Sequence, residues 1–553
     1  FYTFPTRYPA DEVPFSEMRR RKTTVNSWDV ALPCVVLYNT TSHSGVAVHP
    51  VTLEDDFSQT LIEKEGQVTI ESAFHARTSL KPGESLTSGD EYISLSNAPL
   101  NGVIAAVGRR WHDSSFRCQT APAWSRGAVL YGSYAGGTDS SWMRDIGGLK
   151  NFTTFLLPRL EALGVDAIWF NPLNPGSYGI TEYCEVDPRN GTMEDLANTV
   201  KEAKKRKMRV LLDMIPHGPT RNSRLGRKIV AENPEWVSRD RAGEMKSWWG
   251  GLCMDYAAPG WQAYISDVAR FYMERCAVDS WRVDVAVSSP DNESPRPGLR
   301  PSQSRMYGAL ELLRTLRKTI KANDPEAILL GECGSVTHLS ECDYIYDMHW
   351  GLTAIPDLHN RPAAEWCRAA KRFLSRQQAA LPEGAVFGLM RFAENHDTCR
   401  ADWRFGSGHA RALIALNFLI PGMAFLYSDQ DIGFGPMIAR LSQVRKRPEF
   451  RNGTALYEEI TTSDAAVFTF ARQSGNAFSV VAINFSGEEK PLRIGLPRAF
   501  CRAVEVIAGA PVSLLDDELK FSIPPYDLRV VALDSEDAAV APPRREECTT
   551  TPD

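Results

Sequence analysis

Eight short apolar runs, seven of them followed by a helical pattern, constrain the fold of this chain more than any other feature. The runs are rich in β-branched and aromatic residues, and the segments between them repeat apolar residues at helical spacing. The expected strands are 128–134, 165–170, 208–215, 280–285, 327–331, 343–349, 385–392 and 423–427. The expected helices are 149–163, 194–206, 260–275, 304–322, 363–380, 408–419 and 436–445. This alternation is typical of parallel βα units.

Eight strands with helical crossovers predict an α/β fold, a closed (β/α)8 TIM barrel. The alternative is a doubly wound open sheet. No Gly-x-Gly-x-x-Gly motif follows the first expected strand, which argues against a dinucleotide-binding sheet of that kind.

The length of 553 residues leaves room for further domains on either side of the barrel. Short alternating runs before the barrel predict a β-rich N-terminal domain, and those after it predict a C-terminal antiparallel β-sandwich. The N-terminal runs are 35–38, 46–49 and 102–107, and the C-terminal runs are 465–471, 477–484, 492–496 and 528–533. The expected domains are 1–125, the barrel at 126–455 with a short insertion at about 216–259, and the sandwich at 456–534. Residues 535–553 lack apolar periodicity and are expected to form a flexible tail.

The composition excludes several classes of protein. With 43% hydrophobic and 24% charged residues, the chain is an ordinary globular protein rather than a disordered, collagen-like or coiled-coil one. Its 62 basic and 68 acidic residues give a net charge of −6, so no nucleic-acid partner is expected. No apolar run is long enough to predict a membrane span. The 11 scattered cysteines favour a reducing, cytoplasmic compartment, but a secreted or periplasmic location and the oligomeric state stay open.

Three carboxylates close the ends of different expected strands. Asp284 follows strand four, Glu332 follows strand five and Asp397 follows strand seven. One such acid is more often a helix cap than a catalytic group, but three on separate barrel strands would meet at one mouth. Paired carboxylates of this kind cleave glycosides. Arg282 shares a strand face with Asp284 and can keep it ionised, while crowding by its neighbours would keep Glu332 protonated.

The sequence also resembles the α-amylase family of glycoside hydrolases (glycoside hydrolase family 13), in seven short motifs that occur in the family's order. The subfamily is not evident. The motifs are GVDAIWFNP at 164–172, YGITEY at 178–183 followed by DPRNGTMED at 187–195, VLLD at 210–213, WRVD at 281–284, LLGE at 329–332, ENHD at 394–397 and PGMAFLYS at 421–428. The resemblance covers roughly residues 126 to 534.

The resemblance implies a role for each matching residue. Asp284 would be the nucleophile, Glu332 the general acid/base and Asp397 the third carboxylate, which grips sugar hydroxyls. The implied substrate-binding residues are Tyr178, which would stack on the sugar, Asp213, Arg282 and His396. Tyr178 could instead pack on the barrel rim, and Asp213 could be a buried structural acid.

The chain departs from the family pattern around this site. His217 and Gly218 stand where the family usually has Asn-His, so a sugar-contacting imidazole is missing, unless His217 takes its place as a substrate-binding residue. Because that Asn is a common calcium ligand in the family, no metal is expected there, and no cofactor is expected elsewhere. Val287 and Ser288 replace a Lys-His pair on the leaving-group side, and Gly179 replaces an Asp found in many exo-acting members.

These observations predict a retaining α-glycosidase with a carbohydrate substrate. Short α-linked glucosyl oligosaccharides or glycosides are expected rather than starch. Transglycosylation or sugar isomerisation at the same site, or a non-catalytic sugar-binding relative, are the alternatives. Trp248 and Trp249, in the insertion, could either stack on sugar rings or fill the core of that insertion.

Overall fold

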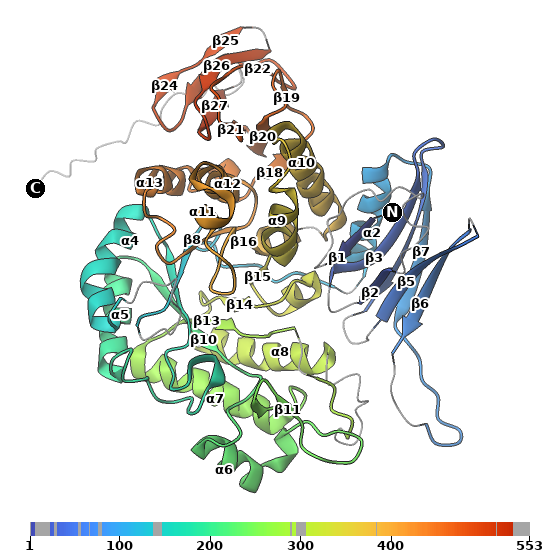
Figure 1. The fold of residues 1–553 in the computed structure, drawn as a ribbon, viewed down its shortest axis with the longest axis vertical. Coiled ribbons are helices and arrows are strands. Elements are labelled where there is room, and N and C mark those ends of the chain that lie inside the picture. The colour runs from blue at the N-terminus through green and yellow to red at the C-terminus, as the bar shows by residue number, and fades with distance from the viewer. Residues whose placement is uncertain are drawn as a thin grey trace, which may run out of the picture.

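The computed structural model has three parts, with the barrel in the centre, the N-terminal sheets on one side and the C-terminal sheets at one end (Figure 1). It describes residues 2–5, 23–26, 30–52, 57–65, 67–75, 80–114, 116–136, 146–287, 290–294, 306–382, 384–515 and 517–534. Ser288 and the expected tail at 535–553 lie outside the described residues. The expected domain boundaries stay predictions.

The central part is a closed barrel of eight parallel strands, which confirms the predicted TIM barrel and excludes the open sheet. In chain order the strands are β8 (Val129–Ser133), β9 (Ala167–Phe170), β10 (Arg209–Met214), β13 (Ser280–Val283), β14 (Leu329–Gly331), β15 (Tyr344–Tyr346), β16 (Leu389–Arg391) and β17 (Met423–Tyr427). Each lies within an expected strand. The barrel closes where β17 pairs with β8, for example Leu426 with Tyr131.

Helices surround the barrel at the expected places. They are α5 (Met193–Lys205), α7 (Pro259–Cys276), α8 (Met306–Asn323), α10 (Ala363–Ala380), α12 (Ser407–Leu419) and α13 (Gly435–Val444). Three short helices were not expected, namely α9 (Ile355–Leu358), α11 (Ala401–Phe405) and α14 (Pro448–Arg451). The helix expected at 149–163 is divided into α3 (Leu149–Asn151), the π-helix η1 (Phe152–Leu156) and α4 (Leu157–Leu163). The start of the seventh expected strand, Ala385–Gly388, is instead the 3-10 helix η7. Two further short helices follow the strands, η5 (Val336–Ser340) after β14 and η6 (His349–Ala354) after β15.

The N-terminal part is β-rich, as predicted, and contains two antiparallel sheets. One has the order β1-β3-β4-β7 and the other β2-β5-β6. Their bounds are β1 (Tyr2–Pro5), β2 (Thr23–Asn26), β3 (Val30–Asn39), β4 (Ser44–Val51), β5 (Phe57–Lys64), β6 (Gln67–Phe74) and β7 (Asp90–Ser96). Val35 and Leu61 are buried together between the sheets.

The strand predicted at 102–107 is wrong, because these residues lie in helix α2 (Leu100–Asp113). The buried residues Val103, Ile104, Val107 and Trp111 recur at a spacing of three or four, which is the helical period. Helix α2 packs between β4 and α10 and so joins the N-terminal sheets to the barrel. At Gly108 the contact is so close that a Cβ atom would lie 2.9 Å from the carbonyl oxygens of Ala380 and Leu381.

The C-terminal part also consists of antiparallel sheets, of six and four strands, with an apolar core shared between them. The strands are β18 (Thr454–Leu456), β19 (Thr461–Thr462), β20 (Val467–Ser474), β21 (Ala477–Asn484), β22 (Lys490–Gly495), β23 (Arg502–Glu505), β24 (Ala510–Pro511), β25 (Ser513–Leu515), β26 (Glu518–Ile523) and β27 (Leu528–Asp534).

Between β10 and α7 the chain leaves the barrel and forms a small lobe. The lobe contains α6 (Arg224–Glu232), the 3-10 helix η3 (Pro234–Trp236) and a hairpin of β11 (Ser247–Trp248) and β12 (Gly251–Leu252). Because the lobe follows the carboxyl end of a barrel strand, it lies on the face where TIM-barrel active sites are found.

Candidate active site

The parity of the barrel strands decides which side chains meet inside. Along a strand, alternate residues face the same side, so Ser280, Arg282 and Asp284 share one face of β13 and its continuation. The same alternation places Leu330 and Glu332 on one side of β14. Lower in the barrel the inward residues are large and apolar, including Trp169, Phe392 and Phe425. The carboxylates therefore lie at the top of a packed core.

Arg282 is the centre of the site. Its guanidinium is completely buried, and Nη1 donates to Asp213 Oδ1 at 2.8 Å and to Asp284 Oδ1 at 2.6 Å. Its Nη2 forms an ion pair with Glu332 Oε2 at 3.0 Å, and its Nε donates to the hydroxyl of Tyr346 at 3.2 Å. One cation thus holds three carboxylates from three different strands.

Asp284 is kept ionised by its neighbours. Burial alone would raise its pKa, but the charge of Arg282 and a contact from His217 outweigh it and lower the pKa to about 2. His217 Nε2 lies 3.3 Å from Asp284 Oδ2, so each carboxylate oxygen has its own partner.

Glu332 has the opposite environment. Burial raises its pKa to about 8; Arg282 opposes this shift, and Asp284 adds to it. The backbone N–H of Val285 donates to Glu332 Oε2 at 2.8 Å. Val285 has φ of 43°, which is unusual for a β-branched residue and marks local backbone strain at the site. Two carboxyl groups on one guanidinium therefore differ in protonation at neutral pH.

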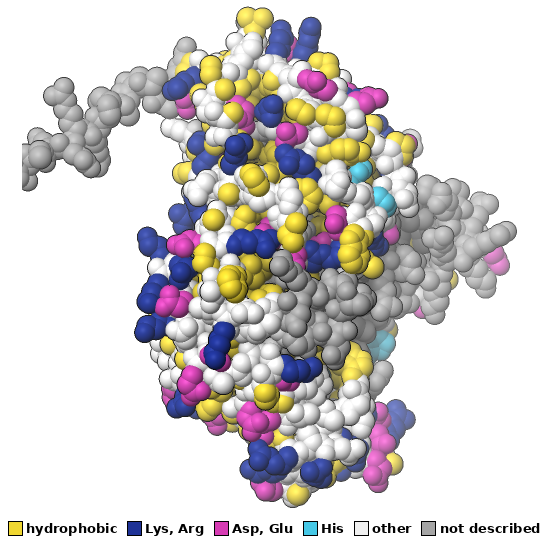
Figure 2. Space-filling model, turned by 60° about the vertical axis from the view of Figure 1, so that its left-hand side comes forward, with side chains coloured by type: hydrophobic (Ala, Val, Ile, Leu, Met, Phe, Trp, Pro, Cys, Tyr) yellow, Lys and Arg dark blue, Asp and Glu magenta, His cyan; other side chains and the backbone are white. Residues whose placement is uncertain are grey.

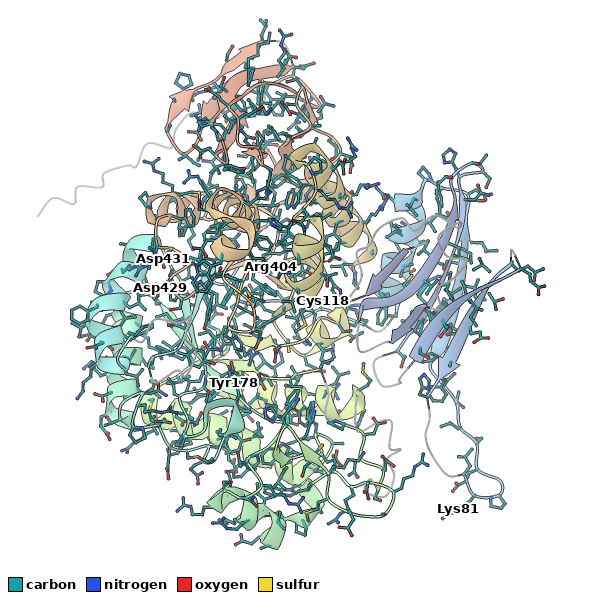
Figure 3. The ribbon with its side chains drawn as sticks, in the orientation of Figure 1. Lys81, Cys118, Tyr178, Arg404, Asp429 and Asp431 are labelled. Carbon is teal, nitrogen blue, oxygen red and sulfur yellow. The ribbon has the colours of Figure 1, made fainter. Side chains whose placement is uncertain are left out.

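A third group of residues lines the wall beside Asp213. Tyr178 donates to Asp213 Oδ2 at 2.9 Å, and Trp169 Nε1 donates to the same oxygen at 3.3 Å. The ring of His396 lies parallel to that of Tyr178, with 5.2 Å between ring centres. Burial, followed by the charge of Arg282, lowers the pKa of His396 to about 3, so this imidazole is neutral. Figure 3 places Tyr178 over the barrel, far from Lys81 in the loop between β6 and β7.

Asp397 is the most exposed of the four carboxylates, with 54% of its side chain accessible. Its hydrogen-bond and ion-pair partners are Asn395 and His396 rather than Arg282. The surrounding protein still raises its pKa, first by burial; Arg282 opposes this, and Asp284 adds to it. All eight predicted site residues are therefore gathered at one end of the barrel.

The replaced motif after β10 has a steric explanation. Gly218 has φ of 126°, and a Cβ atom there would lie 2.4 Å from the carbonyl oxygen of Leu252. No side chain fits, so the family's imidazole cannot occupy this position. His217 points instead at Asp284.

Three tyrosines at the same end of the barrel were not predicted from the sequence. Tyr346 contacts Arg282 directly, whereas Tyr134 and Tyr427 lie near the carboxylates, which help to raise the pKa of each hydroxyl after burial. All three have the inward parity of their strands, and this signal could have identified them.

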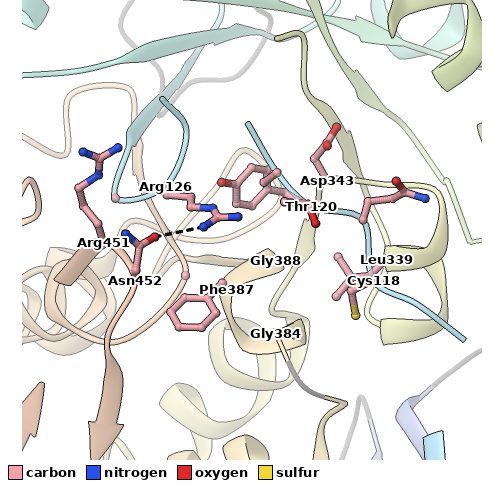
Figure 4. Close-up of a pocket in the computed structure, with 15 residues that line it drawn as sticks. Cys118, Thr120, Arg126, Leu339, Asp343, Gly384, Phe387, Gly388, Arg451 and Asn452 are labelled. Atoms are coloured by element: carbon pink, nitrogen blue, oxygen red, sulfur yellow. Dashed lines mark hydrogen bonds between the residues drawn. The ribbon is translucent and has the colours of Figure 1, made fainter. Parts of the chain in front are cut away.

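Among the cavities lined by described residues, two lie outside this cluster. One, of about 280 Å³, lies at the opposite end of the barrel, where Gly388 and Gly422 precede their strands and Arg126 donates to Asn452 (Figure 4). Barrel ends of that kind contribute to stability rather than catalysis. The other, of about 260 Å³, lies on the catalytic face and is lined by Arg400, Trp403 and Ile432.

Within the ranges that the structure describes, no group of three or more His, Cys, Asp or Glu side chains is arranged to hold a metal ion. In those same ranges no helix is both long and apolar enough to cross a membrane. On the face shown in Figure 2, acidic and basic side chains are interspersed and form no wide field of one sign.

Comparison with known proteins decides the family. The model of the alpha-amylase catalytic domain matches residues 132–234 and 253–470. The chain belongs to the alpha-amylase family. Its barrel is the catalytic domain of a glycosidase, and the gap in the match, 235–252, contains the whole hairpin in the lobe after β10.

Relatives in this alpha-amylase family are distant and varied. Alpha-amylase MalA of Haloarcula japonica is 25% identical over 417 residues, which cover 68% of this chain and 58% of that protein. Neopullulanase 2 of Thermoactinomyces vulgaris is 22% identical, covering 74% of this chain and 78% of that protein. A solved maltogenic alpha-amylase from Thermotoga neapolitana shares the fold, with a TM-score of 0.59 at 20% identity over 74% of this chain and 99% of its own. The chain thus spans little more than half of the Haloarcula protein.

Proposed function

We propose that this protein is a retaining α-glycoside hydrolase, with Asp284 as nucleophile and Glu332 as general acid/base. The observation that carries the proposal is the pair of carboxyl groups on Arg282 with opposite pKa shifts. A nucleophile must be ionised and an acid must hold a proton, and these environments supply both at neutral pH. Sharing one guanidinium also favours the short separation, about 5–5.5 Å, that retaining enzymes use.

The reaction then proceeds in two steps. The Asp284 carboxylate bonds to the anomeric carbon while the bond to the leaving oxygen breaks, and Glu332 gives that oxygen its proton. In the second step ionised Glu332 takes a proton from water, the water oxygen bonds to the anomeric carbon and the bond to Asp284 breaks. Both carboxyl groups return to their starting states.

The other residues position the sugar. Tyr178, held by Asp213 and Asn171, offers a ring face to the sugar that is transferred. The exposed carboxylate of Asp397 is free of Arg282 and can accept hydrogen bonds from sugar hydroxyls. His217 steadies the nucleophile, since its Nε2 lies beside Asp284.

The substrate class follows from the departures around this site. Gly218 supplies no hydrogen-bond donor to the sugar, and the leaving-group side lacks the Lys-His pair. A site without a donor for a given hydroxyl gains nothing from that hydroxyl. Short α-glucosyl oligosaccharides or α-glucosides therefore fit the proposal better than starch.

Leaving-group dependence tests the two roles. Glu332→Gln should slow hydrolysis of maltose by roughly 10²–10⁴-fold, the usual worth of general acid catalysis. The glycosylation step with α-glucosyl fluoride should be spared, because fluoride leaves without a proton. Asp284→Asn should lose both activities. An equal loss with both substrates in the Glu332 variant would remove Glu332 from the acid role.

A further inference from the structure

The tip of the β11–β12 hairpin carries a residue that local folding preferences oppose. Trp249 and Gly250 connect the two strands, and both have positive φ, 50° and 78°. Two-residue turns of this kind favour Asn, Asp or Gly, because a bulky side chain is strained in the left-handed region. The Trp249 side chain is also 67% exposed. Neither backbone geometry nor burial accounts for a tryptophan at this position.

The exposed indole is connected to the catalytic carboxylate through ring contacts. Trp249 stacks on Trp248 with 4.1 Å between ring centres and 19° between ring planes. The edge of His217 meets both rings, at 5.4 Å from Trp249 and 6.1 Å from Trp248. His217 in turn lies 3.3 Å from Asp284. The stacked pair Trp248 and Trp249, here called the platform, is therefore separated from the proposed nucleophile by one side chain, His217.

Backbone and ion-pair contacts fix the hairpin in place. The backbone N–H of Leu252 donates to Pro219 at 2.9 Å, and that of Met254 donates to His217 at 3.2 Å. Lys246 bonds to the carbonyl oxygen of Asp291 at 2.7 Å and pairs with Glu293 at 3.0 Å. Both the loop after β10 and the segment after β13 thus hold the tryptophans beside the site.

The two aromatic groups beside the site contact different residues. Tyr178 contacts Asp213 and His396, whereas Trp249 contacts Trp248 and His217. In the proposed function Tyr178 faces the sugar that is transferred, so a second platform beyond Asp284 faces what is attached to it. Nδ1 of His217 is buried without a hydrogen-bond partner among the described residues and lies next to this platform.

We propose that Trp249, supported by Trp248, is a stacking site for a ring on the leaving-group side of the scissile bond. The ligand class is a pyranose or an aryl group, because the C–H face of a sugar and an aromatic ring both pack on an indole. The same platform would receive an acceptor ring, whose hydroxyl could replace water in the second step. This inference rests on the proposed function and extends it to the other half of the substrate.

The test compares leaving groups with and without a ring. Wild type, Trp249→Ala and Trp249→Phe are assayed with α-glucosyl fluoride, 4-nitrophenyl α-glucoside and maltose. In Trp249→Ala we expect kcat/KM to fall roughly 3- to 10-fold for the two substrates with a ring, the usual worth of one aromatic stacking contact. The value for the fluoride should stay nearly unchanged, and Trp249→Phe should retain most activity. Phe155→Ala, which removes a 71% exposed aromatic ring on the outer helices, is the matched control.

Each other result would contradict the inference. An equal loss with fluoride would mean that Trp249 acts on the transferred sugar or on the fold, and no loss with any substrate would mean that the platform binds nothing. A wild-type protein that hydrolyses none of the three substrates would overturn the proposed function itself. Because the wild type is measured first, the two failures are distinguishable.

Discussion

At the residue scale, the site depends on an excess of carboxylates over cations. Asp213, Asp284 and Glu332 share Arg282, and one positive charge cannot compensate for three buried negative charges. The excess negative charge is removed by protonation. Burial raises the pKa of Asp213 to about 7 and that of Glu332 to about 8, while Asp284 stays ionised. The difference between the proposed nucleophile and the proposed acid thus arises from their positions around one guanidinium.

The opposite pKa shifts of Asp284 and Glu332 predict the pH dependence of activity. For maltose, kcat/KM should fall as pH rises through about 8, because Glu332 then loses the proton that it must donate. On the acid side, activity should persist as long as the protein stays folded, since Asp284 is protonated only near pH 2. With α-glucosyl fluoride, which needs no protonation, the alkaline decrease should be absent. The same decrease with both substrates would assign it to a group other than Glu332.

Much of this site could be predicted from sequence, for a physical reason. Asp284, Glu332 and Asp397 follow strands, and closure of the barrel brings strand ends together whatever the loops do. The strained backbone of Val285, which holds Glu332, could not be predicted, because φ at a turn depends on the packing around it. The contact between His217 and Asp284 was missed for the same reason, since it depends on the path of the loop after β10.

At the element scale, the buried strands of the barrel were the easiest elements to predict from the sequence. The helices that follow them were the next easiest. All eight barrel strands are found, because parallel strands buried on both faces are continuous apolar runs. Helix α2 was mistaken for a strand, since six residues are too few to separate the two periods. The π-helix η1 was also missed, because one extra residue in a helical turn leaves the apolar pattern almost unchanged.

The packing of β12 against the loop after β10 explains why the family motif changes there. We expect Gly218→Ala to destabilise the protein by about 1–3 kcal/mol, as overpacking of a close contact does. Gly243→Ala is the matched control, because Gly243 also has positive φ but a Cβ atom there meets nothing within 4 Å. The melting temperature should fall clearly more for Gly218→Ala. Equal shifts in the two variants would show that backbone strain, not the contact with Leu252, excludes a side chain.

At the scale of the whole molecule, the three parts form one body around a single catalytic face. Helix α2 fastens the N-terminal sheets to α10, and the C-terminal sheets pack on the other side of the same helix through β20. The lobe after β10 extends from the catalytic face and carries the tryptophan hairpin. We therefore expect the loops and the lobe to set substrate choice and the barrel to supply the common chemistry.

This division predicts the substrate profile. We expect kcat/KM for soluble starch to be lower than for the best of maltose, isomaltose, sucrose, trehalose and aryl α-glucosides. The reason is that Gly218 and Val287 cannot make the hydrogen bonds to substrate that the family's usual residues make at these positions. Steady-state kinetics with the whole panel measure this directly. Starch turned over at least as efficiently as every small substrate would refute our interpretation of these substitutions.

The central claim is that Asp284 and Glu332 act in a two-step reaction with retention, and the anomer of the first product tests it most directly. NMR spectra recorded in the first minutes of hydrolysis, before the sugar mutarotates, distinguish the two anomers. Two successive displacements at the anomeric carbon predict that an α-linked substrate first releases the α-anomer. Initial release of the β-anomer would mean one direct displacement by water, and Asp284 could not then be the nucleophile.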